Sequence, residues 1–132
     1  MASIFTKIVN EEIPSYKIAE TEQFLAFLDA FPIVKGHTLV IPKQEVDYIF
    51  DLDDQMLAEL QLFAKKVALG IEKAFPCERI GQAIVGLEVP HAHIHLIPLQ
   101  GPLDIDFSKP KLQFTTEEFS SIAEKIKQHI TL

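Results

Sequence analysis

The sequence has a single cysteine, no tryptophan and far fewer basic than acidic residues. One cysteine, Cys77, cannot form a disulfide within the chain, which is typical of a reducing compartment, and we expect a cytoplasmic protein. The 12 Lys and Arg residues against 19 Asp and Glu residues give a net charge of −7. That balance argues against binding to a nucleic-acid polymer or an anionic membrane, because both require clustered positive charge. One pocket can still be locally favourable for a small phosphorylated ligand.

Long apolar runs are also missing. No stretch approaches the roughly 20 apolar residues of a membrane span. The first seven residues, MASIFTK, lack the basic start and apolar core of a secretory signal. Repeats, low-complexity segments and linkers are absent as well. For 132 residues these features predict one domain, 1–132, large enough to bury a core without disulfides.

Apolar periodicity and capping residues predict an α+β fold. The long helix is expected to begin at Asp53 or Asp54 and to end near Phe75, and the C-terminal helix to begin after Thr115. The other predicted elements are a short helix over 4–12 and strands over 16–19, 24–28, 37–41, 79–85 and 91–99. Strands in hairpin-like succession, with one long and one C-terminal helix, indicate a five-stranded antiparallel sheet.

Three of the five histidines, His91, His93 and His95, stand at alternate positions of one apolar run. Successive side chains of a strand point to opposite faces, so the three imidazoles share one face and the apolar residues between them line the other. We expect the apolar face to lie under the long helix. The histidine face is then expected to open to a cleft, because burying an imidazole without partners costs about 1–3 kcal/mol.

The histidine row has three interpretations. The imidazoles can be structural, each bonded to a backbone carbonyl. They can bind a metal, although residues two apart on a strand lie roughly 6.5–7 Å apart, which makes convergence of three difficult. They can also act on a phosphate, where one neutral imidazole attacks and its neighbours donate to phosphoryl oxygens. The turn from Gly86 to Pro90 favours this third interpretation, since Gly86 lets the backbone approach a ligand closely.

The run His91–Ile97 resembles the signature of the histidine triad (HIT) superfamily, in which three histidines alternate with apolar residues. The resemblance extends in the expected order over the core, 3–100. Beyond the core, over 101–132, we expect an extended arm over 101–111, to which the sequence assigns no role, and then the C-terminal helix. The other matching segments are Ile4–Ile8, Glu12–Pro14, Phe24–Asp29, Gly36–Lys43 and Gly86–Pro90. The branch that it is most similar to is the Hint-like nucleotide phosphoramidase group. Members form homodimers with a ten-stranded sheet and hydrolyse nucleoside monophosphate derivatives through a nucleotidyl-histidine intermediate.

The resemblance implies a role for each matching residue. His93 would be the nucleophile, His91 would orient its ring, His95 would contact phosphate, and His37 would complete the histidine cluster. Asp29 would accept hydrogen bonds from the ribose hydroxyls, although a turn at the end of a strand explains it equally well. The remaining expected binding residues would surround a purine base or form the rim of the site; they are Phe5, Ile8, Phe27, Gly86 and Glu88.

The chain also departs from the family pattern. Some members carry a Cys-x-x-Cys near the N-terminus as half of a structural zinc site, but Ser3 and Thr6 stand there in this chain. We therefore expect no structural zinc and no required cofactor. The segment Ile80–Gln82 replaces the usual Asn-x-Gly, and Leu87 follows Gly86 where a polar residue is common. A nucleotide-binding signalling module with little catalysis, and a nucleotidyltransferase of the same superfamily, remain alternatives to a hydrolase.

Overall fold

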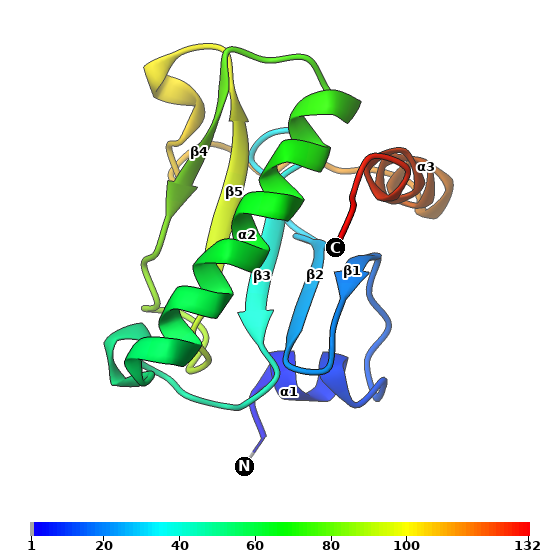
Figure 1. The fold of residues 1–132 in the computed structure, drawn as a ribbon. Coiled ribbons are helices and arrows are strands. Elements are labelled where there is room, and N and C mark those ends of the chain that lie inside the picture. The colour runs from blue at the N-terminus through cyan, green and yellow to red at the C-terminus, as the bar shows by residue number, and fades with distance from the viewer. Residues whose placement is uncertain (1) are drawn as a thin grey trace.

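The computed structural model describes residues 2–132 and contains one five-stranded antiparallel sheet (Figure 1) with the strand order β1-β2-β3-β5-β4. The strands are β1 (Lys17–Glu20), β2 (Phe24–Leu28), β3 (Thr38–Pro42), β4 (Arg79–Ala83) and β5 (Ile94–Leu99). The helices are α1 (Ile4–Val9), α2 (Asp54–Ala74) and α3 (Thr116–Lys127), with short 3-10 turns η1 (Ile49–Asp51) and η2 (Pro102–Asp104). This arrangement confirms the predicted α+β fold with a five-stranded antiparallel sheet.

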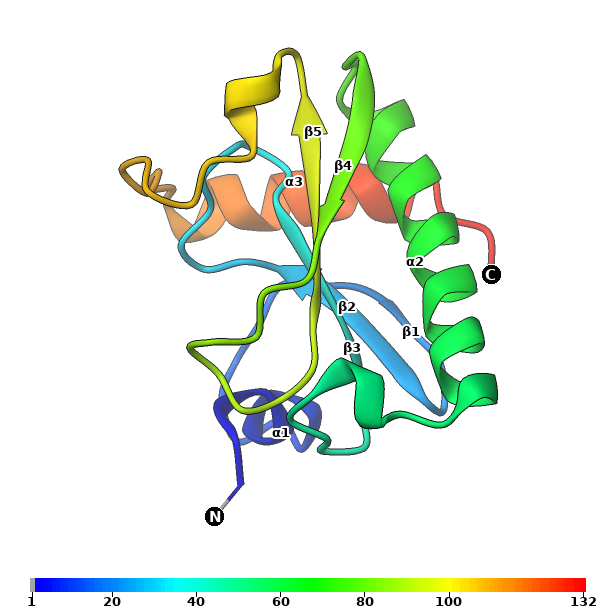
Figure 2. The same cartoon turned by 90° about the vertical axis from the view of Figure 1, so that its left-hand side faces the viewer.

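The two faces of the sheet are covered differently (Figure 2). Helices α2 and α3 pack on one face around a large apolar cluster, which includes residues 92, 94 and 96 as predicted. Helix α1 covers part of the opposite face, where Phe5 and Ile8 pack against the outward residues of β2 and β3. Alternate residues of β2 belong to the two apolar clusters, and all five residues of this strand are buried. No helix covers the rest of the second face, and a ligand can reach the sheet there.

Local capping fixes where the two longer helices begin. Asp53 caps α2 by accepting a hydrogen bond from the backbone of Met56, and Thr115 caps α3 by accepting one from Glu118. The Glu118 carboxylate in turn accepts from the backbone N–H of Thr115. Both predicted starts are confirmed, because an N-cap is decided by side chains only a few residues apart.

Other predicted boundaries were wrong. The first helix ends at Val9 rather than at residue 12, because Glu11 adopts a positive φ of 61° and Glu12 donates back to the carbonyl of Lys7. The strand expected over 79–85 ends at Ala83. The strand expected over 91–99 begins only at Ile94, since its register with β3 ends where Ile94 faces Val40. His91 and His93 therefore precede β5, and His95 alone of the three lies in it.

The segment after β5 folds back over the second face. It passes through η2 and is tied to the loop after β2, where the Leu112 N–H donates to the Pro32 carbonyl at 2.7 Å. The sequence predicted an extended arm over 101–111 without a role. Among residues 2–132, no helix has the length and apolar character that crossing a membrane requires.

Candidate functional site

A pocket of about 490 Å³ opens on the second face of the sheet, between α1, the segment before β5 and the arm. Nine of the ten residues that the sequence nominated line it; they are Phe5, Ile8, Phe27, Asp29, His37, Gly86, Glu88, His93 and His95. The tenth, His91, has no exposed surface and lies behind the pocket. The histidine face thus opens to a cleft through His93 and His95, whereas His91 is part of the supporting structure.

His93 is held in one tautomer by the backbone. Its Nδ1 lies 2.7 Å from the carbonyl oxygen of His91. Because a carbonyl can only accept, Nδ1 carries the proton and Nε2 keeps a free lone pair when the ring is neutral. The Phe5 ring meets the imidazole edge to face, with 5.0 Å between centroids, and restricts its rotation. The ring is therefore oriented, with an unprotonated nitrogen available in the pocket wall.

His91 fixes the carbonyl on which His93 depends. Its Nε2 donates to the carbonyl of Pro42 at 2.8 Å, so Nδ1 is the unprotonated nitrogen and accepts from the Ser3 hydroxyl at 2.8 Å. Burial lowers the pKa of His91, which keeps the ring neutral near pH 7. Both ring nitrogens have partners, so this imidazole is a structural support with no free atom for chemistry.

Ser3 and Thr6 connect this support to α1 and to the loop after β3. The Ser3 hydroxyl also caps α1 by accepting from the Thr6 N–H. The Glu45 carboxylate accepts from the Ser3 N–H at 2.6 Å and from the Thr6 hydroxyl at 2.7 Å. These two hydrogen bonds, chiefly the one from the backbone, lower the pKa of Glu45 to about 2. A chain of hydrogen bonds therefore runs from Glu45 through Thr6 and Ser3 to His91.

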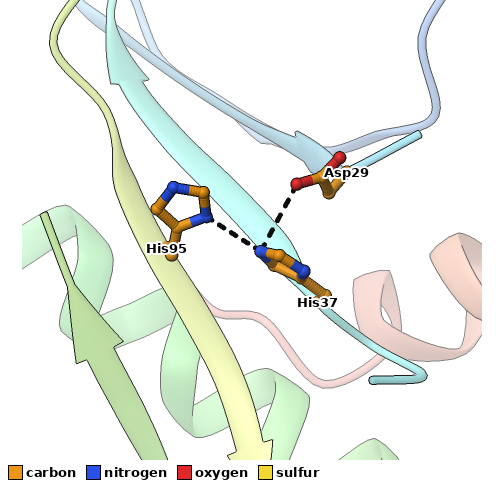
Figure 3. A group of neighbouring side chains, drawn as sticks. All are labelled: Asp29, His37 and His95. Carbon is orange, nitrogen blue, oxygen red and sulfur yellow. Dashed lines mark hydrogen bonds and ion pairs between the residues drawn. The ribbon is translucent and has the colours of Figure 1, made fainter. Parts of the chain in front are cut away.

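Asp29, His37 and His95 form a second polar group (Figure 3). The Ile33 N–H donates to Nδ1 of His37, so the neutral ring carries its proton on Nε2. This Nε2 nitrogen lies 2.9 Å from Nδ1 of His95 and 3.4 Å from the Asp29 carboxylate. Since Nδ1 of His95 accepts, its own proton is on Nε2. His95 thus offers an N–H donor beside the lone pair of His93.

Burial keeps both rings of this group neutral. It lowers the pKa of His37 and of His95 to about 4 each, with smaller contributions from neighbouring positive charge. The two imidazoles consequently act as hydrogen-bond donors near pH 7 and bring no positive charge to the pocket.

The same three residues offer atoms within 4.8 Å of one another, as a metal site would. The hydrogen-bond pattern opposes that use. Nδ1 of His37 already accepts a backbone N–H, so a metal on Nε2 would require an imidazolate or the loss of that bond. The group fits a proton-ordered hydrogen-bond chain better than a metal centre.

Asp29 forms a hydrogen bond within the loop after β2 and also lines the pocket. One carboxylate oxygen accepts from the Phe31 N–H at 2.8 Å, which is the turn-forming role expected at a strand end. Its side chain keeps 17% of its surface exposed and lines the pocket. Both interpretations of Asp29 are thus compatible with its position.

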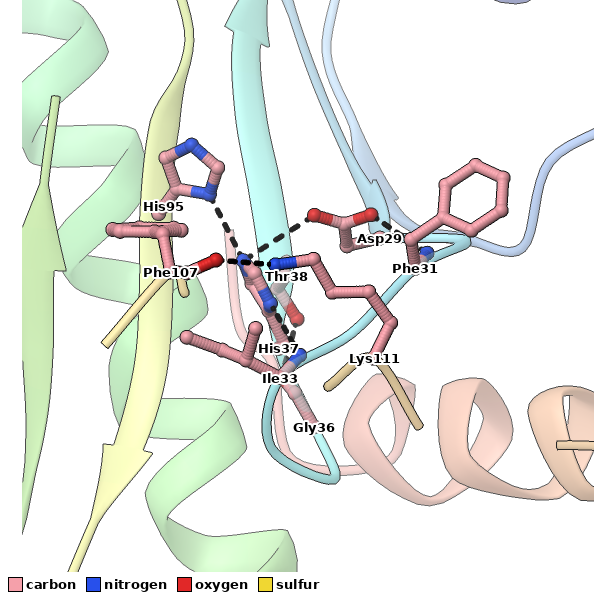
Figure 4. Close-up of polar contacts among 9 residues, drawn as sticks. All are labelled: Asp29, Phe31, Ile33, Gly36, His37, Thr38, His95, Phe107 and Lys111. Atoms are coloured by element: carbon pink, nitrogen blue, oxygen red, sulfur yellow. Dashed lines mark hydrogen bonds and ion pairs between the residues drawn. The ribbon is translucent and has the colours of Figure 1, made fainter. Parts of the chain in front are cut away.

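Phe107 and Lys111 were missed by the sequence reasoning (Figure 4). The Phe107 ring lies 4.7 Å from His95 and 6.3 Å from His37 between centroids, and Lys111 lines the pocket. The Lys111 ammonium donates to the Phe107 carbonyl at 2.7 Å. No periodicity marks the arm, so no pattern could have placed these two side chains at the site.

The chain is similar to known proteins in both sequence and fold. A family model described as HIT domain matches residues 10–101. Adenosine 5′-monophosphoramidase hnt1 of Schizosaccharomyces pombe is 37% identical over 133 residues, covering 98% of this chain and 99% of that protein. The crystal structure of a Hit-like protein involved in cell-cycle regulation from Bartonella henselae matches with a TM-score of 0.83 at 30% identity, over 97% of this chain and 96% of that one. The Zn-bound histidine triad family protein from Mycobacterium smegmatis matches with a TM-score of 0.80 at 25% identity, over 97% of this chain and 95% of that one. The alternating histidines, the five-stranded sheet beside them and these similarities lead to one conclusion: the chain belongs to the HIT family.

Proposed function

We propose that this protein is a nucleotide hydrolase of the Hint-like branch, acting on nucleoside monophosphate derivatives through a nucleotidyl group on His93. The observation that carries the proposal is the Nδ1 hydrogen bond of His93 to the His91 carbonyl, which leaves Nε2 as a nucleophile beside the pocket. The similarity to a protein named an adenosine 5′-monophosphoramidase supports the same class of substrate. Phosphoramidates, acyl phosphates and dinucleoside polyphosphates all contain the required bond.

The reaction takes two displacements at phosphorus. In the first, Nε2 of His93 bonds to phosphorus, and the leaving group departs with the bonding electrons and takes a proton from solvent. In the second, a water oxygen attacks phosphorus, the P–N bond returns its electrons to Nε2, and a proton is released with the nucleoside monophosphate. In this proposal the Nε2–H of His95 donates to a phosphoryl oxygen throughout, which stabilises the charge that develops on that oxygen.

The nucleoside is assigned to the apolar end of the pocket. Phe5, Ile8 and Phe27 are buried around that end and offer a flat purine an apolar surface. Asp29 lines the pocket, and its carboxylate lies 3.4 Å from Nε2 of His37, so that it can accept from ribose hydroxyls beside the histidines. Gly86 and Glu88 contribute to the rim, and the positive φ of Gly86, 74°, gives that rim its turn.

Turnover of adenosine 5′-phosphoramidate tests the proposal. The wild type should release AMP, and His93→Ala should reduce turnover by at least about 10³-fold because the covalent route is lost. His129→Ala is a matched control, since His129 is exposed beyond the C-terminal helix. Normal turnover by His93→Ala would remove the nucleophile assignment.

One observation favours a binding module with little catalysis as the second candidate. Gln82, the polar residue nearest to the usual Asn-x-Gly position, makes two amide hydrogen bonds with Gln61 on α2 and does not line the pocket. If calorimetry shows that AMP binds and no nucleotidyl derivative is turned over, the binding module is the correct interpretation. A nucleotidyltransferase would instead pass the nucleotidyl group to an acceptor that competes with water.

We propose a homodimer in which β4 strands from two copies pair into a ten-stranded sheet. Strand β4 is an edge of the sheet, whereas α3 contacts the opposite edge strand β1. Beside β4, helix α2 exposes Leu62 and Leu69, at 59% and 48% of their surface. Light scattering coupled to size-exclusion chromatography should give twice the chain mass. A Leu62→Glu variant should reduce that mass, because it puts a charge on the exposed apolar surface beside β4.

We propose further that the protein works without zinc, in the cytoplasm. Two of the positions that would hold thiolates carry hydroxyls, and both hydroxyls are engaged in hydrogen bonds, with His91 and with Glu45. Elemental analysis of untagged protein should find less than stoichiometric zinc. The one thiol, Cys77, is unpaired, which supports a reducing compartment.

A further inference from the structure

The charges around the pocket are unfavourable for a phosphate. Asp29 and Glu88 line it, the protein has a net charge of −7, and burial keeps His37 and His95 neutral near pH 7. Neutral imidazoles donate hydrogen bonds but do not balance an anion. A nucleotide therefore needs a cation from elsewhere in the pocket wall.

Within the part of the chain that the structure describes, one Lys or Arg lines the pocket, and it is Lys111 on the arm (Figure 4). Its ammonium donates to the Phe107 carbonyl, which uses one of its three protons. The Phe107 ring is packed on His95, so this contact places the ammonium at the histidine end of the pocket. The Leu112 N–H donates to the Pro32 carbonyl and ties the neighbouring backbone to the loop after β2.

We propose that Lys111 is a phosphate-binding residue and that Phe107 and Lys111, both on the arm, form the wall of the phosphate end of the pocket. The inference rests on the proposed nucleotide function and adds the source of charge that the histidine cluster lacks. His95 supplies a directed N–H to the phosphoryl group, and the two remaining ammonium protons of Lys111 supply charge-assisted contacts. The ligand class that follows is a nucleotide with at least one anionic phosphoryl oxygen, in preference to a nucleoside.

A purely structural role makes a different prediction. If Lys111 only tied the arm through the Phe107 carbonyl, removing it would loosen the whole wall, and a nucleoside and its monophosphate would lose affinity alike. If it binds phosphate, the loss is confined to the charged ligand. Comparison of AMP with adenosine therefore separates the two roles.

The test is calorimetric titration of the full chain with AMP and with adenosine at two salt concentrations. Lys111→Met should weaken AMP binding by about tenfold or more and leave adenosine binding within about twofold. Lys111→Arg should retain most of the AMP affinity, because it keeps the charge. Lys109→Met is the matched control: Lys109 lies two residues away, pairs with Asp104 at 3.5 Å and does not line the pocket.

Two results would overturn the inference. One is AMP affinity within twofold of the wild type in Lys111→Met; the other is an equal loss for adenosine and AMP. A wild type that binds neither ligand would instead refute the proposed function, so the two failures are distinguishable. Weaker AMP binding to the wild type at high salt, with no such change in Lys111→Met, would support a charge contact.

Discussion

Replacement of Ser3 by Ala tests how strongly the N-terminal helix supports the histidines. The hydroxyl caps α1 through the Thr6 N–H and donates to the buried Nδ1 of His91. Alanine fits the space that serine leaves and keeps the backbone N–H that donates to Glu45. The perturbation thus removes two hydrogen bonds without adding volume.

The magnitude follows from those two bonds. Loss of an N-cap costs about 1 kcal/mol. A buried acceptor left without its donor costs about 1–3 kcal/mol more. His91 has no exposed surface through which water could replace the hydroxyl, and the Thr6 hydroxyl, 3.4 Å from Nδ1, already donates its one proton to Glu45. The free energy of unfolding should therefore fall by about 2–4 kcal/mol. Turnover should fall as well, because the His91 carbonyl holds the Nδ1–H of His93.

Urea denaturation of Ser3→Ala and Thr115→Ala is the assay. The Thr115 hydroxyl caps α3 in the same way but donates to no buried imidazole. Its loss should therefore lower the free energy of unfolding by only about 1 kcal/mol. The difference between the two variants isolates the bond to His91. If Ser3→Ala is destabilised by no more than Thr115→Ala, the buried hydrogen bond has no net value and the supporting role of Ser3 is refuted.

Three further predictions concern the same face. Because burial lowers the pKa of His37 and His95 to about 4 in the folded state, the unfolded chain binds more protons between about pH 6.5 and 4. Stability should therefore decrease as the pH is lowered through that range, by at most about 1.4 kcal/mol per pH unit for each histidine, and a flat profile of urea midpoints would contradict the burial. Phe107→Ala should admit water to both rings and raise their pKa values toward the usual range, as followed by NMR titration; unchanged values would show that the ring does not shield them. Gly86→Ala should cost about 1–2 kcal/mol, because its φ of 74° strains any side chain although nothing lies within 4 Å of the new methyl group. Gly101→Ala, equally uncrowded but extended, should be close to neutral, and equal melting temperatures for the two variants would refute the strain argument.

Patterns over a few residues predicted the local structure well. The caps at Asp53 and Thr115 depend on neighbours three residues away, and the alternation of histidines with apolar residues depends only on the geometry of extended chain. Residues 92, 94 and 96 belong to the apolar cluster on the α2 side although β5 begins at Ile94, and before the strand the Ala92 N–H donates to the Val46 carbonyl.

Contacts between distant segments were beyond any such pattern. Pairing with β3 sets the start of β5, and so His91 and His93 were wrongly expected inside the strand. The hydrogen bond from Ser3 to His91 joins residues 88 apart, and that from Ser3 to Glu45 joins residues 42 apart.

The sequence by itself determined which residue types would share a face and to which family they belong, because both are properties of spacing along one chain. Only the tertiary structure decided which imidazole is buried as a support, which nitrogen of each ring carries the proton, and that Lys111 reaches the pocket. Those outcomes depend on which carbonyl, hydroxyl or backbone N–H each side chain meets, and packing of the whole chain sets those encounters.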